Sequence, residues 1–243
     1  QINGLTVVDL GDYRFGFPVR VTASTCAGDE GLLNIEREVE LSGPIHDKGV
    51  LILHSYLSSL FAHIAPLAMN AAVVFEQEYS GVEGDSASCA EFYALLSSLS
   101  GSPMQQGIAV TGAVNQHGEL LPVGGINEKI EGYFRSCESL GLTGDQGVLM
   151  PRRNLRHLML DERVVQAVTA GRFHIHVADT ASEGMALLTG MRFGVLGLGG
   201  YDADSVLGRS QKTLQRFRHA CEHLGKPAVN PNHMRHLKHS IYR

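Results

Sequence analysis

The chain of 243 residues is 44% hydrophobic and 19% charged, which is the composition of an ordinary globular protein able to bury a sizeable core. Its formal net charge of -5 excludes the strongly basic surface that nucleic-acid-binding proteins usually carry. The four cysteines form no CxxC pair and no apolar run is long enough to span a bilayer, so we expect a reduced, cytoplasmic protein without a disulfide framework.

The chain begins at Gln1 within an apolar run and without a methionine, and it contains no GxxxxGK[ST] loop for nucleotide phosphates. These two features lead us to expect a fragment of a longer protein that carries no P-loop ATPase of its own. A module that binds ATP would have to lie elsewhere in the parent protein.

The first forty residues alternate apolar and polar side chains between glycines, which is typical of strands. We predict strands over 5–10, 15–22 and 33–41, in a curved and mostly antiparallel sheet. The apolar spacing then changes to the helical period, which predicts a buried helix over 48–65 that Pro66 ends. A short run rich in valine predicts the next strand, over 71–76.

Segments of both kinds alternate from residue 79 to residue 190. After a glycine-bearing loop over 79–85, the spacing of apolar residues predicts helices at 87–99, 126–140, 161–170 and 181–188. The predicted strands cover 107–114, 119–122, 147–150 and 172–177, with a turn at 115–118. This alternation predicts fold class α/β (α+β), a sandwich of mixed short sheets and helices.

The residues after Gly190 differ in composition from those before it. We predict a glycine-rich linker over 194–200, an amphipathic basic helix over 204–224 and a loose His-rich tail over 227–243. The chain is therefore divided into a domain over 1–190 and a C-terminal linker, helix and tail over 191–243. The helix could pack on this domain or on a neighbouring one.

A serine stands at the entrance of a predicted helix in the loop 83–88, which reads Glu-Gly-Asp-Ser-Ala-Ser. Free N–H groups and the positive end of the helix dipole surround such a position, and they are the elements of an oxyanion hole. Ser88 and Glu91 also form the S-x-x-E pattern of a capping box, and Asp85 or Ser86 could cap the helix as well. Capping explains Ser88, but it does not explain a serine two residues earlier in the loop.

A lysine occupies the first turn of the helix predicted over 126–140. Paired glycines, Gly124 and Gly125, precede this helix, which places Lys129 beside its N-terminus. The positive end of the helix dipole disfavours a second positive charge and should lower the pKa of Lys129. A neutral amine could act as a general base toward a serine hydroxyl, whereas the alternative is a solvated helix lysine.

The two motifs together resemble the proteolytic domain of Lon peptidases. The catalytic serine and lysine of that family are separated by the same 43 positions as Ser86 and Lys129. Three further stretches agree in order, namely 45–53, Val110-Thr111-Gly112 with Gly118 downstream, and 183–190. The similarity covers about residues 1–190, and the hexapeptide at 83–88 looks like the archaeal-type branch rather than the branch with proline before the serine.

The resemblance implies roles for individual residues. Ser86 matches the nucleophile and Lys129 the general base that later protonates the leaving amine. Thr111 matches the threonine that helps to position the lysine, although a strand could use a β-branched residue there for its shape alone. Similarity to the archaeal-type enzymes implies that Glu83 and Asp85 could pair with Lys129 and hold the site idle. Their alternative is to be solvated loop acids.

The resemblance also implies partners and a location. It implies polypeptide substrates, a homo-hexameric ring and an AAA+ ATPase module in the parent chain, to which ATP and Mg²⁺ would belong. No cofactor or metal is expected in this chain, and no nucleic acid is expected as its ligand.

Three alternatives remain open. One is a Ser-His-Asp hydrolase, since the Ser86 loop is one residue short of a G-x-S-x-G elbow and His46, His54 and His63 are available. Another is a metal site at His174 and His176, or at His219 and His223 with i, i+4 spacing. The last is a catalytically silent assembly module, which would have no need of Ser86, Lys129 and Thr111 together.

Overall fold

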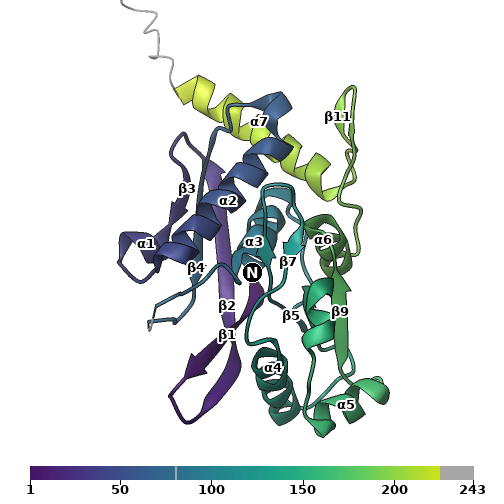
Figure 1. The fold of residues 1–243 in the computed structure, drawn as a ribbon. Coiled ribbons are helices and arrows are strands. Elements are labelled where there is room, and N and C mark those ends of the chain that lie inside the picture. The colour runs from purple at the N-terminus through teal and green to yellow at the C-terminus, as the bar shows by residue number, and fades with distance from the viewer. Residues whose placement is uncertain (80, 225–243) are drawn as a thin grey trace, which may run out of the picture.

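The computed structural model describes residues 1–79 and 81–224, which form a seven-stranded mixed sheet with helices packed against it (Figure 1). In sheet order the strands are β3 (Gly31–Asn34), β4 (Met69–Phe75), β2 (Arg14–Ala27), β1 (Ile2–Asp9), β5 (Ile108–Val110), β8 (Gly147–Pro151) and β9 (His174–Ala178). The α/β class is therefore confirmed. Within this sheet β2 pairs antiparallel with β1 and with β4, and the other four pairs are parallel. The antiparallel arrangement predicted for the first strands therefore holds for β1 and β2, whereas β3 pairs parallel with β4.

Helices supply the crossovers that parallel pairing requires. They are α1 (Ile35–Glu38), α2 (Pro44–Leu60), α3 (Ser88–Ser100), α4 (Ile126–Leu140), α5 (Glu162–Thr169), α6 (Ala181–Thr189) and α7 (Val206–Leu224), with 3-10 turns η1 (Ala62–Ile64) and η2 (Arg152–His157). Two small hairpins join β6 (Ala113–Val114) to β7 (Leu120–Leu121) and β10 (Leu196–Gly197) to β11 (Gly200–Tyr201). The predicted bounds of α4 are confirmed, because its amphipathic period and its glycine boundaries are both local signals.

The middle of the sheet is buried on both faces, and its side chains alternate between two cores. Ile108, Val110 and Leu149 contribute to a core that contains α2, α3 and α6. Ala109 and Val148 point the other way, into a core with α4 and α5. The short strands β5 and β8 are thus held from both sides, which gives rigid support to the segments that leave their ends.

In the first part of the chain one predicted strand is wrong and one predicted helix has different bounds. The strand expected over 33–41 ends at Asn34 and is followed by the short helix α1, whose Glu36 is buried and accepts the Phe75 N–H at 2.8 Å. A side-chain carboxylate there replaces the next ladder bond. The helix expected over 48–65 is present as α2, but it begins earlier, at Pro44, because proline fits the first turn of a helix. It ends at Leu60, and the 3-10 turn η1 follows before Pro66.

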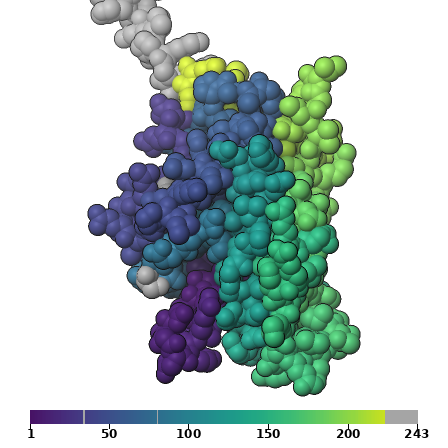
Figure 2. Space-filling view, in the orientation of Figure 1, coloured from purple at the N-terminus to yellow at the C-terminus, as the bar shows by residue number. Residues whose placement is uncertain are grey.

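The segment after Gly190 is packed on the domain up to Leu224. Residues 194–200 were predicted as a linker, but they include β10 and the turn to β11, and this hairpin projects from the body of the molecule (Figure 2). Helix α7 packs against α3 and buries Leu214, while the Tyr201 hydroxyl donates to the Leu60 carbonyl at 2.7 Å. The predicted division at residue 190 stays a prediction, and the His-rich tail lies outside the described residues.

Nowhere in residues 1–79 and 81–224 does a helix have both the length and the hydropathy needed to cross a membrane.

Strand β2 and helix α4 approach each other at a pair of glycines. A Cβ atom at Gly132 would overlap the carbonyl oxygen of Gly16, and a Cβ atom at Gly16 would overlap the backbone of Glu128 and Lys129. Only glycine at both positions lets the two backbones lie this close. This contact sets the distance between the sheet and the helix that carries Lys129.

Gly132→Ala is therefore expected to lower the free energy of unfolding by about 2 kcal/mol or more, because overlap with backbone cannot be relieved by a rotamer change. Alanine would gain about 1 kcal/mol of helix propensity, which the overlap outweighs. Gly124→Ala is the control, since a Cβ there meets nothing within 4 Å. Urea unfolding of the three proteins measures both effects, and equal stability of wild type and Gly132→Ala would refute the close contact.

Candidate active site

Ser86 is held at the N-terminal end of α3 by a backbone link to the sheet. Its carbonyl oxygen accepts the Gly112 N–H at 2.9 Å and the Thr111 hydroxyl at 3.4 Å. The Gly112 carbonyl in turn accepts the Cys89 N–H at 3.1 Å. These bonds explain why the strand predicted over 107–114 breaks after Val110. The chain leaves the sheet there and binds the segment that carries Ser86.

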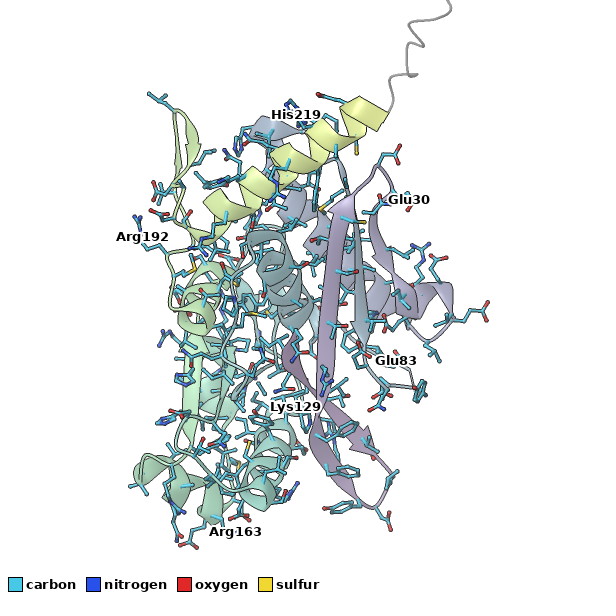
Figure 3. The ribbon with its side chains drawn as sticks, turned by 180° about the vertical axis from the view of Figure 1, so that it is seen from behind. Glu30, Glu83, Lys129, Arg163, Arg192 and His219 are labelled. Carbon is cyan, nitrogen blue, oxygen red and sulfur yellow. The ribbon has the colours of Figure 1, made fainter. Side chains whose placement is uncertain are left out.

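Lys129 reaches Ser86 from the first turn of α4. Its side chain is buried, with 4% of the residue exposed, and lies inside the body of the molecule (Figure 3). The Lys129 Nζ donates to the Ser86 Oγ at 2.9 Å and to the Thr111 Oγ1 at 3.0 Å. Residues from three separate segments therefore converge on one amine.

The surroundings of Lys129 favour its neutral form. Burial, and after it the positive charge of Arg14, lower the pKa of Lys129 to about 8, while Asp85 acts in the opposite direction. The sequence predicted this direction from the helix dipole, but the largest cause is burial. Arg14 was not singled out by the sequence. It lies on β2 and pairs with Glu128 at 3.5 Å, on the helix turn that carries Lys129.

Glu83 and Asp85 lie close to the site without binding the amine. Among the described residues no ion pair joins Lys129 to a carboxylate. Asp85 packs against Gly49 of α2, and the Glu83 carboxylate lies against Gly43 at the start of the same helix. Their regulatory role stays a prediction.

Comparisons with known proteins agree with this geometry. The family model for the Lon protease (S16) C-terminal proteolytic domain matches residues 79–189. A Lon protease homolog of Escherichia coli (strain K12) is 44% identical over 190 residues, which cover 77% of this chain and 32% of that protein. A homolog from Haemophilus influenzae is 41% identical over 192 residues, with 78% and 32% covered. The chain carries a Lon-type proteolytic domain.

The chain spans about a third of the length of these two relatives. Similarity extends to the archaeal branch, since the archaeal Lon protease of Archaeoglobus fulgidus is 38% identical over 93 residues, covering 38% of this chain and 14% of that protein. The family assignment and the branch suggested by the hexapeptide at 83–88 are thereby supported.

The capping box predicted at the start of the Lon-type site is wrong. The N-cap of α3 is Ala87, and no side chain caps the helix. Ser88 is buried, and its Oγ accepts the Val114 N–H at 3.0 Å. The Glu91 carboxylate, which would have completed the box, turns to His46 at 3.2 Å. Long-range partners have replaced the local one.

The same helix start offers fewer oxyanion donors than expected. The Ser88 N–H donates to the Asp85 carbonyl at 3.0 Å, and the Cys89 N–H is bound to Gly112. The N–H groups of Ser86 and Ala87, which precede them, remain the candidates for an oxyanion hole.

A histidine base and a metal site are less well supported than the lysine. His46 bonds to Glu91 and His63 to Gln211 at 2.8 Å, while His54 lines a surface groove between β3 and α2. His174 bonds to the Gly144 carbonyl at 2.7 Å, and the described residues contain no group of three or more potential ligands in reach of one metal ion. The His223 side chain lies outside the described residues.

His46 and Glu91 form a buried pair that the sequence did not predict. The two side chains are 1% and 3% exposed, and no local pattern signals a contact across 45 positions. Burial alone would lower the pKa of His46, but the hydrogen bond and charge of Glu91, with Glu36 and Asp47, raise it above its ordinary value. His46 on α2 is thereby tied to the helix that follows Ser86.

Stability should therefore fall as pH rises through the pKa of His46. Because the pKa of His46 is raised by folding, the His46–Glu91 pair contributes its full stabilising free energy below pH 6.5, the ordinary value. That contribution is lost as the pH rises above the pKa of His46 in the folded protein. Glu91→Gln is expected to cost about 2 kcal/mol at pH 6 and to flatten this dependence. Urea unfolding between pH 5.5 and pH 8 measures this pH dependence of the free energy of unfolding, with Glu162→Gln, at an exposed position, as the control. Parallel pH profiles for wild type and Glu91→Gln would contradict it.

Proposed function

We propose that this Lon-type domain is a serine endopeptidase in which Ser86 is the nucleophile and Lys129 the general base. The observation that carries the proposal is the 2.9 Å hydrogen bond between the Lys129 Nζ and the Ser86 Oγ in a buried environment. With its pKa lowered to about 8, roughly a fifth of Lys129 is neutral near pH 7.4 and can accept the hydroxyl proton, whereas an ordinary lysine is almost wholly charged there.

The reaction is acyl transfer in two halves. Lys129 takes the proton of Ser86 as the Oγ attacks the peptide carbonyl, and it then gives that proton to the leaving amine. Water next attacks the acyl carbonyl while Lys129 takes a proton from it. The bond between the Ser86 Oγ and the acyl carbon then breaks, Lys129 returns the proton to the Ser86 Oγ, and the new carboxylic acid leaves. Thr111 accepts a hydrogen bond from the Nζ at 3.0 Å and orients the amine. This chemistry requires no metal or organic cofactor.

The whole protein is proposed to act on unfolded or damaged polypeptides as a hexameric ring, with ATP and Mg²⁺ used by a separate AAA+ module of the parent chain. A cytoplasmic location belongs to the same proposal. The family assignment supports these points, and the net charge of -5 agrees with the absence of nucleic acid among the expected ligands.

The test is hydrolysis of casein and of short fluorogenic peptides by the wild-type chain, Ser86→Ala and the exposed control Ser139→Ala. A serine-directed acylating probe, followed by mass spectrometry, locates the modified residue. Loss of hydrolysis and of labelling in Ser86→Ala alone supports the proposal, and activity that survives in Ser86→Ala refutes it. A folded wild type that neither hydrolyses nor becomes labelled would favour the silent assembly module.

A cavity beside Ser86 suggests the preferred residue at the cleaved bond. Apolar side chains form much of its wall, together with two carboxylates. The lining includes Leu5, Val19, Phe75, Val82, Ala87, Glu78 and Glu83. An apolar substrate side chain would gain contact there, whereas an acidic one would be repelled by the carboxylates.

Peptides with leucine before the scissile bond are therefore expected to exceed those with aspartate by at least about 100-fold in kcat/KM, the factor that roughly 3 kcal/mol supplies. A matched pair of peptides that differ only at that residue measures the ratio. Equal rates for the two peptides would show that the side chain does not enter this cavity.

A further inference from the structure

Asn154 is a fully buried amide that binds the backbone just before α4. It is 0% exposed and lies in η2, after β8. Its Nδ2 donates to the Val123 carbonyl at 2.9 Å, and its Oδ1 accepts the Val123 N–H at 3.0 Å. One side chain thus satisfies both polar groups of Val123, as a neighbouring strand would. Val123 stands two residues before Gly125, the N-cap of α4.

A second asparagine, within α4 itself, binds the backbone of the residues that follow β8. Asn127 is in the first turn of the helix, two residues before Lys129. Its Oδ1 accepts the Met159 N–H at 2.8 Å and its Nδ2 donates to the His157 carbonyl at 3.1 Å. The residues that follow β8 therefore hold the start of α4 at two points, one just before the helix and one inside it.

Strand β8 also fixes the second partner of the lysine. The Leu149 carbonyl of β8 accepts the Thr111 N–H at 3.1 Å. Thr111 and the start of α4 are thus attached to one continuous segment, and its strand is buried on both faces of the sheet. The Lys129 Nζ on α4 and the Thr111 Oγ1 lie 3.0 Å apart, so the two attached segments meet at the amine.

We infer that Asn154 and Asn127 are positioning residues for the reaction, which set the helix that carries Lys129 against Ser86 and Thr111. The inference rests on the proposed function. A misplacement of about 1 Å in a catalytic group costs on the order of 100-fold in rate, and the lysine amine must reach two oxygens at once. Neither asparagine touches the reacting atoms, so each acts through α4.

A purely structural role would predict only a loss of stability, so the test needs a readout at the amine itself. The chain has only five lysines, which makes ¹³C-lysine NMR practical. The Lys129 resonance is assigned by its loss in Lys129→Arg. Its titration, expected near pH 8 in the wild type, reports whether the amine is still buried against Ser86.

The variants are Asn127→Ala, Asn154→Leu and the control Asn115→Ala. Asn115 also bonds to backbone, accepting the His117 N–H at 2.9 Å and the Glu119 N–H at 3.0 Å, but it lies in the turn between β6 and β7. If Asn154→Leu fails to fold, the half-buried Asn127 still provides the test. Folding of each variant is checked by circular dichroism.

In Asn127→Ala we expect the Lys129 titration to move up toward the ordinary lysine range and kcat to fall about 10- to 100-fold, with KM within about twofold of wild type. Asn115→Ala should change neither. An unchanged Lys129 titration in folded Asn127→Ala would overturn the inference, even if kcat falls, because the amide would then be only structural.

Failure of the proposed function has a different signature. Full activity in Ser86→Ala would refute the dyad, while the NMR titration would still report whether the asparagines position Lys129. A dead Ser86→Ala together with an unmoved Lys129 titration in the asparagine variants would leave the dyad intact and refute only the positioning role.

Discussion

Replacing Lys129 with methionine is expected to lower kcat/KM for peptide hydrolysis by a factor of about 10⁴ or more, the size of effect seen when a general base is removed from a serine peptidase. The Lys129 Nζ is the group that binds the Ser86 Oγ, at 2.9 Å. Methionine fills a similar volume and cannot accept a proton. The nucleophile would then remain in place as an unactivated hydroxyl.

The matched control is Lys48→Met, which removes an exposed lysine from α2. It should retain the wild-type rate. Activity within about tenfold of wild type in Lys129→Met, with the chain folded, would contradict the assignment of Lys129 as the base. Hydrolysis by the double variant with Ser86→Ala should be no lower than by either single variant, because groups that act as one unit are not additive.

The same replacement should stabilise the protein at neutral pH. Lowering the pKa of Lys129 from 10.5 to about 8 corresponds to a penalty of about 3 kcal/mol on the folded, charged form, from which the lost hydrogen bonds subtract. The unfolded chain holds the proton more tightly, so the penalty is full below pH 8 and disappears as pH rises to 10.5.

Urea unfolding at pH 7 and at pH 10.5 should therefore show a gain of about 1–2 kcal/mol for Lys129→Met at the lower pH and a smaller one at the higher. If Lys129→Met were less stable than wild type at pH 7, the hydrogen bonds and nearby charges of the buried ammonium would have to outweigh the free-energy penalty of its burial.

The parts of the site that follow local sequence patterns were the parts that could be predicted. Helix α4 begins and ends where its apolar period and flanking glycines placed it, and Lys129 lies in its first turn. The meeting of Ser86 with Lys129 followed from the family resemblance, since two motifs 43 positions apart carry no geometric relation of their own.

The errors at the site share a physical cause, which is competition from partners distant in the sequence. Ser88 and Glu91 have the local pattern of a capping box, but Val114 and His46 bind them instead. The linker indicated by composition at 194–200 is a different kind of error, because there a local antiparallel pairing of β10 with β11 forms a hairpin. Asn154 has no local signal at all, because its only marked feature is a contact with a backbone 31 positions away.

The pH dependence of catalysis gives the second large effect. If neutral Lys129 is the base, kcat/KM should rise about tenfold per pH unit below its pKa of about 8 and level off about one unit above it. Between pH 6 and pH 9 the increase is then on the order of 100-fold. Peptide hydrolysis at fixed ionic strength measures the profile, and circular dichroism checks that the chain stays folded across the range.

The position of this rise separates a lysine from a histidine base. An imidazole near its ordinary pKa of about 6.5 would bring the rate to its plateau by about pH 7.5, whereas Lys129 would still be largely protonated there. Arg14→Gln sharpens the comparison, because the charge of Arg14 lowers the pKa of Lys129 and its removal should move the rise to higher pH. Since Arg14 is half-exposed, solvent screens its charge and the displacement should be small. A profile that levels off below pH 7.5 would assign the proton transfer to a group other than Lys129.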